Sequence, residues 1–261
     1  MIKIENVTYK IKNKILLSNI NFTVNKGENI SIIGSNGAGK TTLIKLLNGL
    51  IKATSGKILI LDKDINHYKR KELSKIISYV PQSTGYGYDF TVEEYVTYGR
   101  YTYMTSFGAI NKEDKNIINN VMTETNIYHL KDRKLYTLSG GERQKVFISS
   151  ALAQSAPIII LDEPTVYLDP KATTEINELL QSINKSKNYT MITVTHDLNY
   201  ALLSKSKMLG IKESNQIFYE NYLEAYNNKY FDNLFNTTFL YVKGDNNAPQ
   251  LLPRNLIQNE K

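Results

Sequence analysis

The chain has 261 residues, 41% of them hydrophobic and 22% charged, which is typical of a folded globular protein, and no apolar stretch reaches the roughly 18 residues of a membrane span. It contains no cysteine, which excludes disulfides and thiol chemistry, and its three histidines lack the spacing of a zinc site. The net charge of +7 arises from basic residues spread along the chain, which favours a solvated surface and an anionic ligand over a nucleic-acid-binding basic run.

The first residues, Met1 to Glu5, lack the hydrophobic core of a secretion signal, so we expect a cytoplasmic protein. Residues 1–29 alternate in the manner of β-strands as far as the turn at Lys26–Gly27, and a further strand over 57–61 completes a small antiparallel sheet. Tyr9 ends the first strand in this interpretation. Its ring is either an ordinary surface side chain or a platform on which an adenine stacks.

The strongest motif reads Gly-Ser-Asn-Gly-Ala-Gly-Lys-Thr-Thr and fits the phosphate-loop pattern Gly-x-x-x-x-Gly-Lys-Ser/Thr. The β-branched run Ile30–Ile33 precedes it, and apolar residues at helical spacing follow it. Glycines let backbone N–H groups converge on phosphate, and the following helix directs its positive end there. We therefore expect a triphosphate to be bound by Gly34, Ser35, Asn36, Gly37, Ala38, Gly39, Lys40, Thr41 and Thr42. Lys40 is expected on the β- and γ-phosphates and the Thr41 hydroxyl on Mg²⁺.

A strand over 76–80 ends at Pro81–Gln82, and the region of about 83–138 then changes in character. It begins with the run Gly85-Tyr86-Gly87-Tyr88 and contains helical segments over 92–98 and 115–125, so we predict an inserted helical subdomain. Gln82 taken alone is an ordinary polar residue at a strand end.

The next motif opens a helix that runs from Ser139 toward Ala153. Ser139 followed three residues later by Glu142 is a capping box, which is a sufficient structural explanation for both. Two consecutive glycines, Gly140 and Gly141, are costly at a helix start if capping is their only purpose. They favour a helix start at which the backbone approaches an anion.

The apolar run Ile158–Leu161 is typical of a central strand in a parallel sheet. It delivers Asp162 and Glu163 to the carboxyl edge of that sheet, where such folds bind their ligands. We expect Asp162 to hold Mg²⁺ through water and Glu163 to orient or deprotonate an attacking water. The alternative is a pair of solvated surface acids.

A helix is predicted after Asp169–Pro170, and a further strand over 191–195 ends in His196. A lone histidine at a strand end is usually structural. Here we expect it at the same sheet edge as the phosphate loop, within reach of a γ-phosphate or an attacking water. Beyond residue 211 the chain is rich in Asn, Tyr and Phe, which predicts an extension of helix and strands, with frayed residues at 258–261.

In this order the motifs resemble those of the ATP-binding cassette (ABC) ATPases over about residues 1–210. The matching motifs, in chain order, are Tyr9 (aromatic loop), Gly34–Thr42 (Walker A), Gln82 (glutamine loop), Leu138–Glu142 (signature motif), Ile158–Glu163 (Walker B), Leu168–Asp169 (aspartate loop) and His196 (switch histidine). The signature motif separates this family from other phosphate-loop ATPases.

The resemblance implies an α/β phosphate-loop ATPase with a mainly parallel sheet, an N-terminal antiparallel β-subdomain and an inserted helical subdomain. It implies a single ABC ATPase domain with a nucleotide-binding core over 1–82 and 139–210, the helical subdomain over 83–138 and the C-terminal extension over 211–261. ATP and Mg²⁺ would be the cofactors, with Tyr9 on the nucleotide and Gln82 joining Thr41 and Asp162 (through water) at the metal. Glu163 and His196 would be the catalytic residues.

The resemblance also implies a head-to-tail homodimer. Ser139, Gly140, Gly141 and Glu142 of one copy would contact the nucleotide held by the other, and Asp169 would couple the two copies. Two permease subunits and an extracytoplasmic binding protein would be the partners, with no nucleic acid, and the subunit would lie on the cytoplasmic face of the membrane. The family usually has Gln where this chain has Glu142, so we expect that carboxylate to point away from phosphate.

Within the family, the segments Tyr98–Tyr101, Glu163–Asp169 and His196–Asn199 are similar to those of importers of ferric siderophores, haem and vitamin B12. We therefore predict an importer ATPase that serves iron–siderophore uptake, with haem or cobalamin as alternative cargo. A non-transport ABC ATPase that acts on nucleic acid or ribosomes is a further alternative. Two residues before Leu168 this chain has Val166, where many family members have Ser. This difference weakens the case for coupling between the two copies through the aspartate loop.

Overall fold

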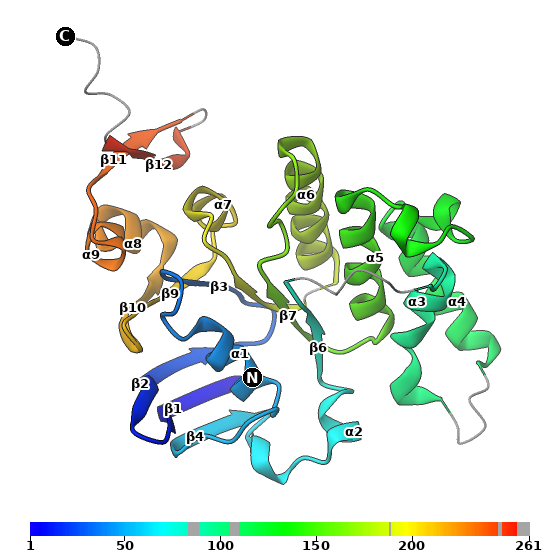
Figure 1. Cartoon of the computed structure of the whole chain (residues 1–261), viewed down its shortest axis with the longest axis horizontal. Coiled ribbons are helices and arrows are strands. Elements are labelled where there is room, and N and C mark those ends of the chain that lie inside the picture. The colour runs from blue at the N-terminus through cyan, green and yellow to red at the C-terminus, as the bar shows by residue number, and fades with distance from the viewer. Residues whose placement is uncertain (83–88, 105–109, 188, 245–246, 255–261) are drawn as a thin grey trace. The chain divides into compact units, whose positions relative to one another are not determined.

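The computed structural model describes residues 1–82, 89–104, 110–187, 189–244 and 247–254 (Figure 1). The run Gly85–Tyr88 and the predicted frayed end at 258–261 lie outside these residues. The described chain forms two compact units, Met1–His67 with Thr190–Lys261 and Tyr68–Tyr189. No helix among the described residues is long and apolar enough to cross a membrane.

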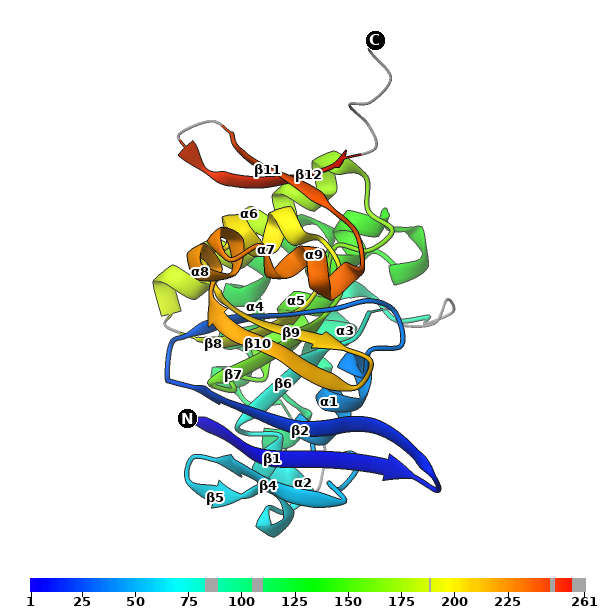
Figure 2. The same ribbon diagram turned by 90° about the vertical axis from the view of Figure 1, so that its left-hand side faces the viewer.

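The first unit contains the predicted antiparallel sheet, in which β1 (Ile2–Ile11) pairs with both β2 (Lys14–Val24) and β4 (Ser55–Ile60) (Figure 2). A short strand, β5 (Lys63–Asp64), extends it beyond β4. The prediction that Tyr9 ends the first strand is wrong, because β1 continues to Ile11. Lys12 has a φ of 52°, a conformation suited to the tight turns that join antiparallel strands, so strand pairing continues to the turn.

The same unit holds a parallel core around β3 (Asn29–Ile33), which pairs with β8 (Thr190–Val194) on one side and β9 (Lys207–Lys212) on the other. Four of the five β3 residues are buried, as the apolar run predicted for a covered parallel strand. Helix α1 (Lys40–Leu47) buries Leu43, Ile44, Leu46 and Leu47. The predicted boundary of the C-terminal extension falls inside β9, which therefore belongs to the core sheet.

The C-terminal part of this unit consists of β10 (Asn215–Asn221), α8 (Tyr222–Asn227), α9 (Tyr230–Phe235), β11 (Phe239–Lys243) and β12 (Pro249–Pro253). Its aromatic residues form a core of their own with α7 (Leu198–Leu203), in which Phe231 is fully buried against Phe218 and Tyr241. The Asn199 side chain donates to the Leu251 carbonyl (3.1 Å) and accepts from its N–H (2.8 Å), which fixes β12 to α7. The predicted mixture of helix and strands is confirmed.

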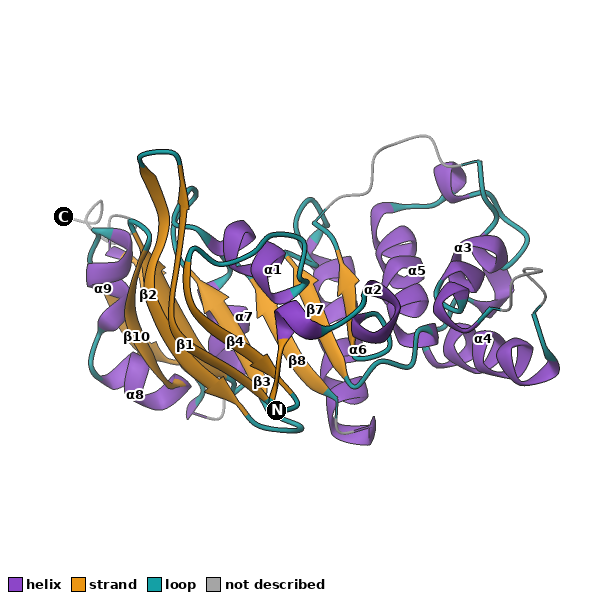
Figure 3. Ribbon diagram, turned by 90° about the horizontal axis from the view of Figure 1, so that it is seen from below, coloured by secondary structure: helices purple, strands orange, loops and turns teal. Residues whose placement is uncertain are grey.

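The second unit pairs β6 (Ile77–Val80) in parallel with β7 (Ile158–Asp162), and every residue of β7 is buried. Helix α5 (Gly140–Ala153) contacts α3 (Val92–Tyr98), α4 (Lys112–Glu124) and α6 (Pro170–Lys187) (Figure 3). The unit also includes α2 (Arg70–Leu73) and short 3₁₀ segments at Tyr101–Tyr103, Tyr128–Leu130 and Leu135–Thr137. The helix over 92–98 is confirmed, and α4 begins earlier than predicted because the Asn111 side chain caps it. The fold is thus the predicted α/β class, with antiparallel strands and inserted helices.

Candidate functional site

The phosphate-loop motif forms the predicted strand–loop–helix unit: β3 ends at Ile33, the loop covers residues 34–39, and α1 begins at Lys40. Ser35, Asn36 and Gly37 are exposed at its crest, and Ala38 is buried beneath it. The Lys40 Nζ donates to the carbonyl oxygens of Gly34 (2.7 Å) and Ser35 (3.0 Å), and this lysine is only 6% exposed. A positive charge is therefore held at the loop by the backbone itself. Thr41 and Thr42 follow in the first turn of α1.

Close packing against neighbouring strands also requires glycine at two positions of the loop, which the sequence analysis did not predict. A Cβ on Gly34 would lie 2.2 Å from the carbonyl oxygen of Ile211, and one on Gly39 would lie 2.5 Å from that of Leu16. Gly39 also has a φ of 109°, which L side chains rarely adopt. At Gly37, by contrast, a Cβ would meet nothing within 4 Å. Gly34 and Gly39 thus allow the loop to pack against β9 and β2, in addition to leaving its backbone open to phosphate.

His196 and Tyr9 belong to the same unit as the loop. The N–H of Thr195 donates to the Ile32 carbonyl (3.1 Å), so the residues after β8 and the loop after β3 emerge at one sheet edge, as predicted. His196 is exposed there. Tyr9 is half-buried and faces Leu17 across the hairpin, and Leu17 packs within 2.7 Å of the position that a Gly39 Cβ would take.

The two predicted carboxylates lie at the end of β7, and they accept hydrogen bonds from a residue of β6 and from a residue just after it. The Tyr79 hydroxyl donates to Asp162 Oδ2 (3.1 Å), and the Gln82 Nε2 donates to Glu163 Oε2 (2.8 Å). Asp162 is 6% exposed, and Glu163 is half-buried with a φ of 49°, a strained conformation for a residue other than glycine. The reading of these acids as ordinary solvated surface groups does not fit this burial and bonding.

Tyr79 was missed by sequence reasoning, which placed it in a core strand without a role. Its burial, reinforced by the charge of Asp162, raises the pKa of its phenol above the ordinary value, so it is a protonated donor at neutral pH. The only signal in the sequence is a hydroxyl-bearing aromatic within a β-branched strand. The donor pair Tyr79 and Gln82 appears only once β6 is known to be the neighbour of β7.

The capping box at the start of α5 is confirmed. Ser139 Oγ accepts from the Glu142 N–H (3.3 Å), while the Ser139 N–H and Oγ both donate to Glu142 Oε2 (2.8 Å each). The bonds from the Ser139 backbone and hydroxyl lower the pKa of Glu142, which is therefore ionised. Its carboxylate turns back onto Ser139 instead of extending away from the helix.

Packing within the chain also favours glycine at Gly140 and Gly141. A Cβ on Gly141 would lie 2.8 Å from the Ala172 Cβ in α6, and one on Gly140 would lie 3.2 Å from Leu168 Cδ2. Asp169 caps α6, since its Oδ1 accepts from the Ala172 N–H (2.9 Å). The start of α5 and the loop before α6 are therefore packed directly together. Tyr167 in this loop is 88% exposed.

The chemistry of these groups fits a magnesium nucleotide. Mg²⁺ in proteins is commonly held by one or two carboxylates together with waters and substrate phosphates. The buried Asp162 carboxylate is a group of this kind, and among the described residues there is no cluster of three or more His, Cys, Asp or Glu side chains that could hold a metal ion. A lysine at a phosphate loop and a carboxylate are group types that enzymes use for phosphoryl transfer to water.

Comparison with known proteins agrees with this chemistry. The ABC transporter family model matches residues 17–166. The iron(3+)-hydroxamate import ATP-binding protein FhuC of Bacillus subtilis (strain 168) is 33% identical over 249 residues, which cover 95% of this chain and 93% of that protein.

Solved structures give the same relationship. An ABC transporter described as of metal-chelate type, in an inward-facing conformation, superposes with a TM-score of 0.85 at 26% identity and covers 97% of this chain and 96% of its own. The dimeric structure of MJ0796, a bacterial ABC transporter cassette, superposes with a TM-score of 0.73 at 31% identity, over 85% of this chain and 99% of its own.

Proposed function

This chain belongs to the ABC transporter family and is an ATP-hydrolysing enzyme, and from that premise we propose that it is the ATPase subunit of an importer for iron–siderophore complexes. The observation that carries the catalytic part is the bonded pair of carboxylates at the end of β7, together with the buried Lys40 at a complete phosphate loop. The cargo part rests on the hydroxamate importer to which the chain is similar over nearly its whole length.

In our proposal the backbone N–H groups of residues 34–42 and the Lys40 ammonium bind the ATP phosphates, and the Tyr9 ring stacks on the adenine. Thr41, Gln82 and, through water, Asp162 would hold Mg²⁺, which neutralises charge on the phosphates when bound. Glu163 orients the attacking water and accepts its proton as the bond from the water oxygen to the γ-phosphorus forms and the bond to the ADP oxygen breaks. His196 donates a hydrogen bond to the γ-phosphate.

The catalytically active form in this proposal is a homodimer. Ser139, Gly140, Gly141 and the Glu142 backbone of one copy contact the γ-phosphate bound by the other copy, and Asp169 couples the copies. The dimeric structure of MJ0796, at 31% identity, supports this arrangement. The Glu142 carboxylate stays on Ser139 at the helix start, which keeps its negative charge bonded as the phosphate approaches.

Two permease subunits and an extracytoplasmic binding protein complete the transporter in this proposal, and they hold the ATPase at the cytoplasmic face of the membrane. Haem or cobalamin is the alternative cargo. A non-transport ATPase acting on nucleic acid or ribosomes is the alternative function, for which the net charge of +7 is the one favourable feature.

The catalytic assignment is tested with Glu163→Gln, which keeps the size and hydrogen-bonding capacity of the side chain but not its basicity. We expect ATP to bind and to accumulate a stable ATP-bound dimer in light scattering, while turnover falls by about 100-fold or more. Lys40→Ala is the matched control, which should lose ATP binding and the dimer together. Near-normal hydrolysis by Glu163→Gln would contradict the role of Glu163.

The cargo is tested by transport into vesicles that contain the reconstituted complex with its permease. Radiolabelled ferric hydroxamates, haem and cobalamin are compared, with the Glu163→Gln complex as the control for ATP-dependent uptake. Uptake of haem or cobalamin without ferric hydroxamate would replace the proposed cargo. Tight, salt-sensitive binding to nucleic acid with no permease recovered in a pull-down would instead favour the alternative function.

A further inference from the structure

The segment Gly99–Arg100 lies against the C-terminal end of α5, the helix that begins at the signature motif. A Cβ on Gly99 would lie 2.2 Å from the Ser150 carbonyl oxygen and 2.9 Å from the Ala153 Cβ, so only glycine lets the chain pass this close. The segment connects α3 to the 3₁₀ turn at Tyr101–Tyr103. The side chain of Arg100 therefore enters the space where α3, α4 and α5 meet.

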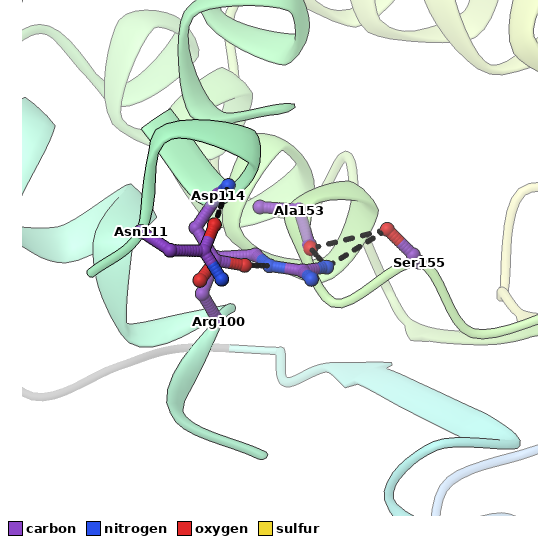
Figure 4. Close-up of polar contacts among 5 residues, drawn as sticks. All are labelled: Arg100, Asn111, Asp114, Ala153 and Ser155. Atoms are coloured by element: carbon purple, nitrogen blue, oxygen red, sulfur yellow. Dashed lines mark hydrogen bonds and ion pairs between the residues drawn. The ribbon is translucent and has the colours of Figure 1, made fainter. Parts of the chain in front are cut away.

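Arg100 is only 5% exposed, and its guanidinium joins three elements (Figure 4). The Nε donates to Asp114 Oδ1 (2.8 Å) in the first turn of α4, and Asp114 is 2% exposed. The Nη1 donates to the carbonyl oxygen of Ala153 (2.7 Å), the last residue of α5, and to Ser155 Oγ (3.0 Å). The Tyr103 ring lies 4.0 Å from the Arg100 Cζ, as expected for a cation–π contact.

These contacts satisfy groups that would otherwise be costly to bury. The Ala153 carbonyl is one of the terminal acceptors that an α-helix leaves without an internal partner, and a cation at that end also opposes the negative end of the helix dipole. Asp114 lies at the positive end of α4, where its N–H donates to Asn111 Oδ1 (2.8 Å). Only a planar guanidinium can reach the carboxylate and the carbonyl together, so lysine is not an equivalent replacement.

The bonded end of α5 is remote from the end that carries the signature motif. The helix spans Gly140–Ala153, and at 1.5 Å per residue it is about 21 Å long. Because a helix of this length behaves as a rigid rod, a rotation or shift of its C-terminal turn also displaces Ser139, Gly140 and Gly141. Fixing Ala153 relative to α4 therefore restricts the positions that the signature residues can take.

We propose that Arg100 is a positioning residue for the signature motif: it fixes the C-terminal end of α5 so that the N-terminal end meets the nucleotide of a second copy in the required orientation. This inference rests on the proposed function, because it requires the signature motif to act across a dimer. Arg100 itself touches neither nucleotide nor water in this proposal.

The test measures ATP-driven dimerisation of the full chain in the Glu163→Gln background, as the protein concentration at which half of the chain is dimeric. Arg100→Gln removes the positive charge and the planar guanidinium. We expect the midpoint to rise about tenfold or more, since a misplaced signature motif loses about one hydrogen bond to the nucleotide of the other copy, and a loss of that size changes an equilibrium about tenfold. Arg100→Lys keeps a positive charge beside the Asp114 carboxylate, so this variant should fold more readily than Arg100→Gln. We expect its midpoint to rise by less, about threefold. ATP affinity of the monomeric variants should stay within about twofold of the parent, because a distant positioning effect leaves the phosphate loop intact.

Glu28→Gln is the control variant, since it breaks an ion pair with Lys207 (3.0 Å) that does not involve α5. It should leave the dimer midpoint unchanged whatever its effect on the Tm. If both Arg100 variants lower the Tm but dimerise at the parental midpoint, Arg100 is merely structural and the inference is overturned. If the Glu163→Gln parent itself does not dimerise with ATP, the proposed dimer is wrong, and the inference falls with it for that separate reason.

Discussion

Replacement of Gly141 by alanine tests why α5 begins with two glycines. The new Cβ would lie 2.8 Å from the Ala172 Cβ, whereas carbon atoms in contact prefer about 3.5 Å or more, so α5 and α6 must separate by about 0.7 Å. Both atoms are fixed to helical backbone and neither can rotate away. Overpacking of this kind costs about 1–3 kcal/mol. Because neither atom can move away, the cost should lie in the upper part of this range, about 2–3 kcal/mol; alanine recovers about 0.4–1 kcal/mol through the reduced entropy of the unfolded chain, so the variant should be about 1–2.6 kcal/mol less stable.

Gly140→Ala is the matched control in the adjacent position. Its Cβ would lie 3.2 Å from Leu168 Cδ2, the end of a side chain that can rotate, so the steric cost is a few tenths of a kcal/mol. The backbone gain then dominates, and we expect a stability equal to the parent or up to about 0.5 kcal/mol higher. The two variants thus differ in the sign of their effect, although the chemical change is identical.

The assay is urea denaturation followed by helical circular dichroism, with free energies of unfolding extrapolated to water. Ala172→Gly removes the opposing methyl group, so the double variant Gly141→Ala, Ala172→Gly should show a favourable coupling energy of about 2–3 kcal/mol in the mutant cycle, equal to the relieved steric cost. A Gly141→Ala protein as stable as the parent, or a coupling energy near zero, would refute the packing argument. The glycines would then be required for the nucleotide alone.

Three further outcomes follow from individual side chains. Tyr79→Phe removes the hydroxyl 3.1 Å from Asp162 Oδ2 and should raise the Mg²⁺ concentration for half-maximal ATPase activity about tenfold, with Mg²⁺-free ATP binding as the unchanged control; an unaltered Mg²⁺ dependence would exclude a role in orienting Asp162. Burial raises the pKa of Tyr200 to about 12, so its contribution to stability is complete below the unfolded-state pKa near 10 and is lost as pH rises toward 12. Between pH 8 and pH 11 the parent should therefore lose on the order of 1 kcal/mol more stability than Tyr200→Phe, and parallel pH profiles would argue against this shift. Phe231→Ala, at a fully buried position, should cost about 3–5 kcal/mol in urea denaturation, whereas Phe235→Ala, which is partly exposed, should cost clearly less; equal losses would contradict the assignment of Phe231 to the core.

The sequence predicted the elements whose causes are local. The run Ile30–Ile33, the glycine loop and the apolar spacing after it lie next to one another in the chain, so strand, loop and helix could be read directly. The cap of α5 was equally predictable, because Ser139 and Glu142 are three residues apart and bond within one turn. The order of motifs then identified the family without any knowledge of distances.

Contacts between distant residues were not predictable in this way. The bond from Tyr79 to Asp162 joins residues 83 apart and requires that β6 and β7 be neighbours. The role of Gly34 depends on the carbonyl of Ile211 in β9, a strand that the sequence analysis did not recognise. Arg100 was noted only as part of a short segment of family resemblance, and its two partners lie in helices whose packing a single sequence does not specify.

The sequence by itself therefore determined the chemistry available to this protein, since residue types and local spacing fix which groups can hold phosphate, metal or water. The tertiary structure decided how those groups are held, because an apolar strand or helix face can pack against many partners and only the folded chain selects one. That selection places the Tyr79 hydroxyl on Asp162 and the Arg100 guanidinium on the last turn of α5.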